Sequence, residues 1–241
     1  MRVLTVVAVV LFHSCLSRCA DDGYVPLVKQ QYADKINNQI RAQITMELQA
    51  SYLYQAYASY FDRADVALPG FKKFFLQASK EEKEHAQILI DYVNKRGGSL
   101  QFSDIKLLDV CDIIKDLSRT VDLSGRRQQT CICYFVSQKR QLLKSKSDPV
   151  CMRPRSDWSH GLMAMEDALL IERKVNSELL DLHDIASSGP TKDPHLTHTL
   201  EHIYLEEQVE SIKKLGNYVA QLSRFSNDYR LGEYLFDQSL Q

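Results

Sequence analysis

The sequence lacks the features that mark several common classes of protein. It has no excess charge of either sign, since 30 Lys and Arg residues stand against 31 Asp and Glu residues, and this balance argues against a nucleic-acid partner or a charged tail. It contains no N-x-[Ser/Thr] glycosylation acceptor. Proline and glycine are scarce, at six and nine residues, so long helices can run with few breaks. No apolar run reaches the ~20 residues of a membrane span, and we expect none.

The one apolar run of note lies at the N-terminus. A Met-Arg start precedes apolar residues 3–12, which small and polar residues 13–20 follow. A basic start, an apolar stretch of roughly ten residues and a small-residue exit are typical of a cleaved signal peptide. We therefore expect a signal peptide at residues 1–19 and a secreted protein. A signal anchor and a buried first helix are the alternatives.

Cysteine usage agrees with export. Two of the six cysteines lie in or beside the signal, which leaves four in the body of the chain. In an oxidising compartment, four cysteines suggest two disulfides with three possible connectivities. A zinc site is the alternative, although the C-x-C pair does not have the usual C-x2-C spacing and no His lies within the group. The four are Cys111, Cys131, Cys133 and Cys151.

Four long segments carry apolar residues at a spacing of three or four, which predicts amphipathic helices. Asp34 and Asp157 are expected N-caps of the first and third helices, and Pro194 is expected in the first turn of the fourth. Short loops join the helices in two pairs, and about 60 residues connect the pairs, so we predict an all-α four-helix bundle with a long crossover. A cysteine-containing insert is expected at about 107–154. The predicted helices cover about 34–62, 70–96, 157–186 and 193–222, with a short fifth C-terminal helix at 232–240.

Polar residues interrupt each apolar stripe near the middle of its helix. A buried charge without a partner is costly, and several carboxylates at one level of a bundle would repel one another. A divalent metal removes that cost, and carboxylates with an imidazole suit iron, manganese or zinc. The interrupting residues are Glu47 and Tyr54 in the first helix, Glu82 and His85 in the second, Glu172 in the third, and Glu207 and Gln208 in the fourth.

The pair Glu82-x-x-His85 has the i, i+3 spacing of di-iron carboxylate bundles. A lone Glu-x-x-His is usually a surface pair, and a one-residue slip in register would expose Glu82. The coincidence of interruptions on four helices favours a buried metal site. A di-iron or di-manganese oxygenase is a further alternative, but such bundles usually carry two such motifs, and only this one lies on a core stripe.

The chain resembles the ferritin family from residue 31 to 241 outside the insert. With the signal and the cysteines, the likeness is greatest to the secreted, yolk-type ferritins of snails. The resemblance implies one ferritin-like di-iron domain. It rests on the segments Glu47–Tyr54, Tyr60–Leu68, Glu81–Ala86, Asn94–Gly98, Trp158–Asn176, Asp193–Leu196, Tyr204–Val209 and Glu233–Asp237.

The resemblance implies an iron-storage protein with a ferroxidase centre. Ferrous iron and dioxygen would be its substrates, and ferric oxyhydroxide would accumulate inside a homo- or hetero-oligomeric shell of twenty-four subunits. The alternative is a secreted yolk iron carrier with little ferroxidase turnover, delivered to yolk platelets. By motif, Glu47, Glu82 and His85 would hold the first iron, Glu82 would bridge to a second iron on Glu172 with Gln208 nearby, Tyr54 would hydrogen-bond near the centre, and Glu207 would guide iron.

Two departures from the family pattern concern iron entry and mineral nucleation. The entry channel has His198 and Glu201 where acidic residues are common, with His183 nearby. Histidine attracts ferrous ion less well than a carboxylate, so entry is expected to be slower or sensitive to pH. At the nucleation surface Glu81 and Glu84 remain, but a Gln stands at position 87, and we expect weaker nucleation.

Overall fold

The structure is a computed structural model that describes residues 26–108, 160–225 and 228–241. The expected signal peptide, all six cysteines and almost all of the expected insert lie outside the described residues. Within the described part the chain is helical and contains no strand.

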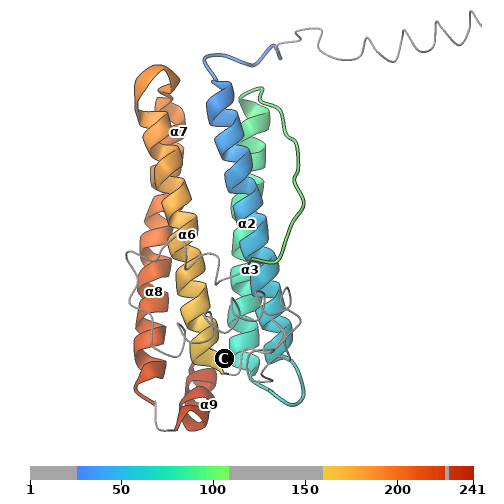
Figure 1. Cartoon of the computed structure of the whole chain (residues 1–241), viewed down its shortest axis with the longest axis vertical. Helices are drawn as coiled ribbons and strands as arrows, with labels where there is room; N and C mark the ends of the chain where they lie inside the picture. Colours follow the sequence, from blue (N-terminus) through green and yellow to red (C-terminus); the bar gives the residue numbers. More distant parts are fainter. Residues whose placement is uncertain (1–25, 109–159, 226–227) are drawn as a thin grey trace, which may run out of the picture.

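The helices form an elongated bundle of four rods with a short helix at one end (Figure 1). The fourth rod consists of three consecutive pieces, the middle one being a π-helical segment. The predicted all-α four-helix bundle with a short fifth C-terminal helix is confirmed. The elements are α2 (Asp34–Phe61), α3 (Pro69–Lys95), α6 (Gly161–Ser187), the 3-10 turn η2 (Gly189–Thr191), α7 (Pro194–Thr199), the π-helical η3 (Leu200–Leu205), α8 (Glu206–Ser223) and α9 (Tyr229–Leu240).

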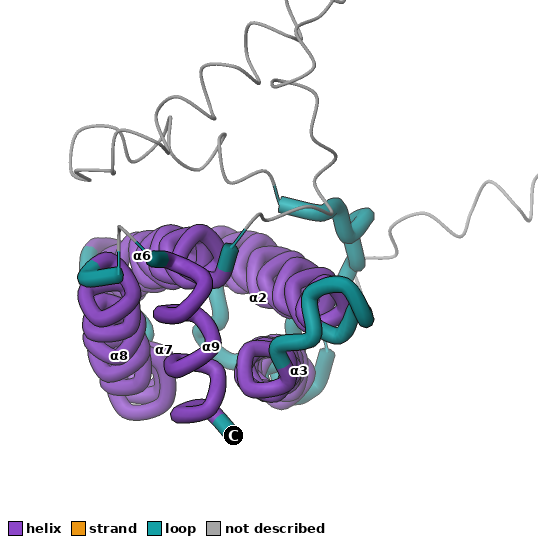
Figure 2. The backbone as a smooth tube through the Cα atoms, turned by 90° about the horizontal axis from the view of Figure 1, so that it is seen from below, coloured by secondary structure: helices purple, strands orange, loops and turns teal. Residues whose placement is uncertain are grey.

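Apolar and aromatic side chains fill the space between the rods. Helix α2 packs against both α3 and α6, and α6 packs against α8, so that the rods surround a common interior while α9 crosses the near end (Figure 2). The rings of Phe61 and Phe75 stack with centroids 5.7 Å apart, and Phe71 stacks on Phe61 at 4.8 Å. Large aromatic rings supply much buried area at each contact, so this end of the bundle is held rigidly.

Two of the predicted helix caps are wrong. Asp34 is the first residue of α2, where Ala33 occupies the N-cap position without a side-chain hydrogen bond, and the Asp34 carboxylate instead pairs with Lys29 at 2.7 Å. Helix α6 begins at Gly161 with His160 as its N-cap, whereas Asp157 lies outside the described residues. The imidazole of His160 accepts a hydrogen bond from the Met163 amide, as a carboxylate could. Histidine is not among the residues preferred at the N-cap, so the sequence did not predict this cap.

Other helix ends agree with the predictions. Asp193 caps α7, since its carboxylate accepts a hydrogen bond from the Leu196 amide at 3.1 Å, and Pro194 opens the helix. Gly97 follows α3 with a φ of 69°, a left-handed conformation that glycine adopts at helix ends without strain. The side chain of Arg96 then pairs with Asp193 at 2.7 Å and ties the end of α3 to the start of α7.

Helix α9 is docked by two buried carboxylates. The Asp237 carboxylate accepts a hydrogen bond from the Phe71 amide in the first turn of α3 at 2.9 Å, and Glu233 accepts one from the Gly161 amide at the start of α6. Helix N-termini have unpaired amides and a positive dipole end. The C-terminal helix therefore closes one end of the bundle by satisfying two other helices.

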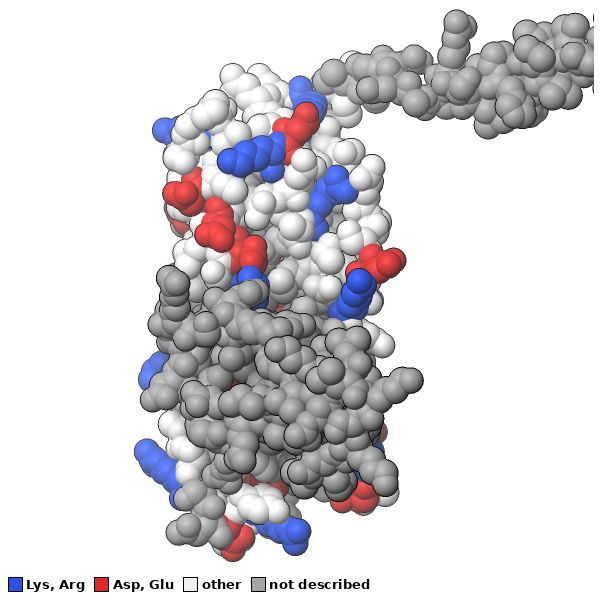
Figure 3. Space-filling model, in the orientation of Figure 1, with Lys and Arg blue, Asp and Glu red and all other residues white. Residues whose placement is uncertain are grey.

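The described surface carries charges of both signs. Lys, Arg, Asp and Glu side chains all occur on the described upper part of the face in Figure 3, as the near-zero net charge predicts. None of the described helices combines the length and the apolar character needed to cross a bilayer.

Candidate metal centre

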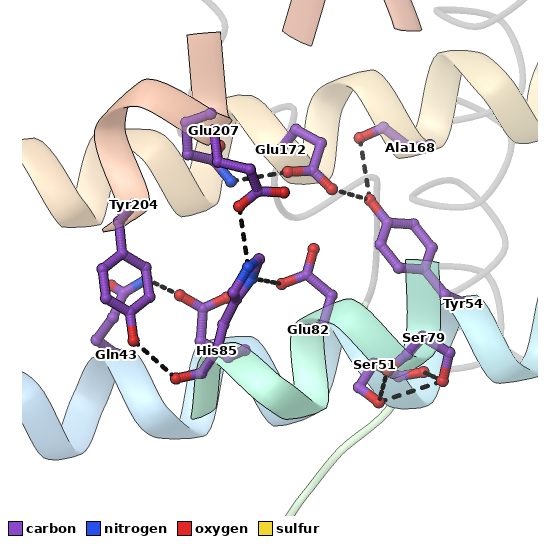
Figure 4. A network of polar contacts seen from close by, with 12 residues as sticks. Gln43, Ser51, Tyr54, Ser79, Glu82, His85, Ala168, Glu172, Tyr204 and Glu207 are labelled. Atoms are coloured by element: carbon purple, nitrogen blue, oxygen red, sulfur yellow. Dashed lines mark hydrogen bonds and ion pairs between the residues drawn. The ribbon is translucent and has the colours of Figure 1, made fainter. Parts of the chain in front are cut away.

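Four rods of the bundle each contribute a buried polar side chain at the same level. Glu47 on α2 is fully buried, Glu82 on α3 and Glu172 on α6 are each 4% exposed, and Gln208 on α8 is 2% exposed. His85 lies one turn after Glu82 on α3 (Figure 4). The register that the apolar stripes predict therefore holds in all four rods, and these four buried side chains point into the bundle.

Three of these side chains form a group compact enough to hold one ion. One ligand atom from each of Glu47, Glu82 and His85 lies within 4.8 Å of the other two. Among the described residues this is the only group of three or more such side chains that is so compact. The two carboxylates and the imidazole come from α2 and α3, which a short loop holds side by side.

The two ring nitrogens of His85 face two different carboxyl groups. Its Nδ1 lies 3.5 Å from Glu82 Oε2, and its Nε2 lies 2.9 Å from Glu207 Oε2 (Figure 4). A carboxylate on the outer nitrogen of a ligating histidine fixes the ring and its tautomer. Nε2–H thus donates to Glu207, and the Nδ1 lone pair is left facing Glu82.

Glu172 faces the group from the opposite side of the bundle. Its Oε1 accepts a hydrogen bond from the Tyr54 hydroxyl at 2.6 Å, and its Oε2 accepts one from the Gln208 amide at 2.9 Å. Glu82 lies between Glu172 and Glu47, and both of these carboxyls act on its protonation. Glu82 therefore has access to two neighbouring positions for a cation.

Burial dominates the electrostatics of the centre. Desolvation raises the pKa of Glu82 well above its usual range, and the charges of Glu172 and Glu47 raise it further. Burial likewise raises the pKa of Glu47 and Glu172. Burial alone would lower the pKa of His85, but the hydrogen bond and charge of Glu207 outweigh it, so the pKa is raised. Without a metal, the cluster retains protons that a divalent ion would displace.

The residues present fit a divalent metal. Glu47 Oε2, Glu82 Oε2 and Gln208 Oε1 are buried and have no hydrogen-bond partner among the described residues, which is costly unless a proton or a cation lies among them. Carboxylate oxygens with one imidazole nitrogen suit iron, manganese or zinc. The unsatisfied oxygens and the ligand types together point to a cation.

Two residues behind the ligands were missed by sequence reasoning. Gln43 donates from Nε2 to Glu47 Oε1 at 2.7 Å, and the Tyr204 hydroxyl donates to the backbone oxygen of His85 at 2.8 Å (Figure 4). The signal for Gln43 was its position on the buried Ile40 and Ile44 stripe, four residues before Glu47. Tyr204 is a buried aromatic residue of the fourth rod, and nothing in the sequence shows where its hydroxyl group would bond.

The π-helical segment η3 sets the angle at which α8 presents its side chains. It spans Leu200–Leu205, immediately before Glu207 and Gln208. One wide turn adds a residue to the helix and rotates everything that follows. Gln208 is thereby buried, whereas the side chain of Glu207 is 40% exposed and connects His85 with the surface.

The predicted channel and nucleation residues are not members of the compact group formed by Glu47, Glu82 and His85. His183 Nε2 and Glu201 Oε1 lie 2.8 Å apart, while the ring of His198 packs on His202 with centroids 4.1 Å apart. Glu81 accepts a hydrogen bond from Gln77 at 2.8 Å, and Glu84 lies 3.5 Å from the Lys80 ammonium. Their predicted roles concern the assembled shell and stay predictions.

Comparison with known proteins agrees with this geometry. A family model for the ferritin-like domain matches residues 37–131 and 134–225. The chain is 48% identical over 226 residues to Yolk ferritin of Lymnaea stagnalis, covering 90% of each chain. It is 39% identical over 214 residues to Soma ferritin of the same species, covering 89% of this chain and 95% of that one. Identity to the middle subunit of ferritin of Salmo salar is 38% over 212 residues, covering 88% and 94%. The predicted resemblance is confirmed.

The buried carboxyls predict that the metal-free protein loses stability as the pH rises. The folded-state pKa of Glu82 lies above its ordinary value of 4.5, so its contribution to stability is complete below that pH and is lost as the pH rises through the folded-state value. The Glu82→Gln variant has no carboxyl group to ionise at this position, so it does not lose this stability as the pH rises. At pH 8 the metal-free variant should therefore be more stable than the parent, by on the order of 1 kcal/mol per subunit, and the difference should shrink at pH 5.

Denaturant unfolding of chelator-treated protein measures this effect. Added Zn²⁺ should reverse the order, because the parent keeps a ligand that the variant has lost. Asp91→Asn is the matched control, since Asp91 is an exposed carboxylate on the same helix that accepts a hydrogen bond from Gln87. Equal pH dependence in parent and Glu82→Gln would contradict the prediction.

Gln43 is predicted to orient Glu47 for metal. Gln43→Leu keeps the side-chain volume but removes the donor to Glu47 Oε1, so affinity for Zn²⁺ should fall about 10–100-fold, as is usual for residues behind a ligand. Competition with a chromophoric chelator measures the change. Gln55→Leu, at an exposed position of α2, should leave the affinity unchanged. Unaltered binding in Gln43→Leu would refute an orienting role.

Proposed function

The chain belongs to the ferritin family, and on that premise we propose that it oxidises ferrous iron with dioxygen at the buried centre. Ferritins store iron, and iron storage is the general role of this chain. The proposal adds the ferroxidase reaction, the residues that perform it and the deposition of ferric oxyhydroxide within an oligomeric shell.

The observation that carries the proposal is the position of Glu82 between two sets of ligands. Glu47 and His85 lie on one side of Glu82, and Glu172 lies on the other. Two ferrous ions held on these two sides would share Glu82 as a common ligand. Paired metals at a shared carboxylate can act on one substrate together.

The reaction needs two electrons from the iron and a site that stabilises the higher positive charge of the ferric ions. Two ferrous ions, one dioxygen and two protons give two ferric ions and one hydrogen peroxide. The ions' combined charge rises by two, and Glu47, Glu82 and Glu172 stabilise the more highly charged product because they lie in a buried, low-dielectric environment. Their raised pKa values mean that iron displaces bound protons as it enters.

Residues around the ligands keep the centre ready for iron. Tyr54 and Gln208 each donate a hydrogen bond to one oxygen of Glu172, which fixes the orientation of this carboxylate. Glu207 contacts His85 and is partly exposed, a position suited to passing iron between the surface and the centre. Ligands on long helices need little rearrangement when an ion arrives.

Export and delivery to yolk belong to the same proposal. The relative with 48% identity is named for yolk, and the apolar N-terminal run is typical of a signal peptide. We infer that residues 1–19 are removed, that Cys111, Cys131, Cys133 and Cys151 form disulfides, and that residues 107–154 lie outside the bundle. The alternative, a yolk iron carrier with little turnover, shares the fold and draws on the same relative.

Aerobic ferrous addition distinguishes catalysis from simple carriage. We expect rapid diferric absorbance in stopped flow, and in Glu82→Ala plus His85→Ala a rate lower by at least about 100-fold, because even a residue behind a ligand is worth about 10–100-fold. Gln87→Ala plus Asp91→Ala changes an exposed pair on the same helix and should keep the parent rate. A parent rate no higher than that of free iron in buffer would favour the carrier.

Storage is tested separately by repeated iron loading. Sedimentation and electron microscopy should find hollow shells that fill with electron-dense mineral. Growth should be slow at first, because Gln stands at position 87 and Lys80 lies beside Glu84, which lessens the negative charge available for nucleation. A small oligomer without a mineral core would rule out storage and leave the oxidation result intact.

A further inference from the structure

A second buried phenol and carboxyl lie close to the metal centre and take no part in it. The Tyr57 hydroxyl on α2 donates a short hydrogen bond to Oδ2 of Asp167 on α6. Tyr57 is fully buried and Asp167 is 2% exposed. Burying a carboxylate in an apolar core is costly, and a phenol could pack there without one. The pair therefore calls for a chemical explanation.

The pair lies within one or two helical turns of the proposed iron ligands. Tyr57 follows Tyr54 by three residues on α2, a rise of about 4.5 Å, and Asp167 precedes Glu172 by five residues on α6, a rise of about 7.5 Å. The ring of Phe75 packs on both phenols, with centroids 5.9 Å from Tyr54 and 5.0 Å from Tyr57. Contacts between neighbouring, tilted rings thus connect Tyr57 through Phe75 with Tyr54, the side chain that touches Glu172.

A phenol that loses an electron must also lose its proton. The oxidised phenol is a strong acid, and a cationic radical would be poorly solvated in the core. Asp167 can take the proton across the existing hydrogen bond, so no net charge is created at Tyr57. The Tyr54 hydroxyl also contacts a carboxylate, but Glu172 is a proposed iron ligand and a bound cation makes it a weaker base. Of the two phenols, Tyr57 is the one whose carboxylate partner is not a proposed iron ligand.

We propose that Tyr57 is a built-in one-electron donor that completes the reduction of hydrogen peroxide when only one ferrous ion is bound. The inference rests on the proposed ferroxidase function, which supplies both the peroxide and the iron. Peroxide accepts two electrons as its O–O bond breaks. One electron comes from the ferrous ion, which becomes ferric, and the other comes from Tyr57, which becomes a neutral phenoxyl radical.

Atoms and charges balance in this step. The phenolic proton passes to Asp167, two further protons come from solvent, and both peroxide oxygens leave as water. Without the second electron, the same encounter yields a ferric ion, hydroxide and a free hydroxyl radical, which attacks whatever it meets. The Tyr57–Asp167 pair thus protects a protein that handles iron and oxygen together.

Rapid-freeze electron paramagnetic resonance tests the proposal. The assembled full-length protein, loaded anaerobically with one ferrous ion per subunit, is mixed with hydrogen peroxide. We expect a phenoxyl signal in the parent and in Tyr60→Phe, a matched loss of another buried α2 hydroxyl, and a signal at background level in Tyr57→Phe. Spin trapping should then detect more hydroxyl radical in Tyr57→Phe than in either of the other two.

A second measurement keeps the proposal testable if Tyr57→Phe fails to fold. The parent radical should show hyperfine coupling to one exchangeable proton, that of Asp167, which disappears in deuterium oxide. Asp167→Asn should lose that coupling or the radical itself. A phenoxyl signal without an exchangeable coupling, or one abolished by Tyr54→Phe but kept in Tyr57→Phe, would overturn the proposal.

Different results would contradict the proposed ferroxidase function and the electron-donor role of Tyr57. If the parent does not oxidise ferrous iron in air, the proposed function fails. If it does so, and Tyr57→Phe does so at the same rate, yet peroxide gives no phenoxyl radical in the parent, only the electron-donor role is lost.

Discussion

The structure depends on the burial of three carboxyl groups halfway along an otherwise apolar bundle. Glu47, Glu82 and Glu172 cannot all be ionised there without a cation, because each is desolvated and repelled by the others. Protons balance this charge in the metal-free state, and iron would balance it in the working state. Burying the three carboxyls costs folding free energy, and a cation that bound only the folded state would offset that cost.

Neighbouring residues keep this cluster from collapsing on itself. Gln43 donates a hydrogen bond to one oxygen of Glu47, and Tyr54 and Gln208 donate to the two oxygens of Glu172, so the orientations of these two carboxylates are fixed. Each donor comes from a long helix whose position is set by buried aromatic and aliphatic packing. Packing far from the ligands therefore controls their geometry, as metal sites require.

Periodicity in the sequence was sufficient for the bundle and for the inward direction of the ligands. Ile36, Ile40 and Ile44 fix the buried face of α2, and Glu47 follows on it. Details that depend on tertiary packing were not accessible. The π-helical segment is a rare irregularity that a regular helical period does not predict. Gln208 is buried just after it, whereas the side chain of Glu207 is 40% exposed, although both residues interrupt the same apolar stripe. Gln43 reads as an ordinary polar residue until Glu47 is known to be its acceptor.

The number of electrons that the bound iron can supply connects the metal centre with the Tyr57–Asp167 pair. A pair of ferrous ions supplies two electrons, which matches one two-electron reduction, but a half-filled centre supplies one and leaves an odd electron to be found. A donor that ligated iron would alter the centre, and one at the surface would react too slowly to compete. A phenol one turn beyond Tyr54, hydrogen-bonded to a carboxyl outside the proposed ligand set, meets both conditions. The same low dielectric that makes the ligand cluster costly also requires that this electron leave together with its proton.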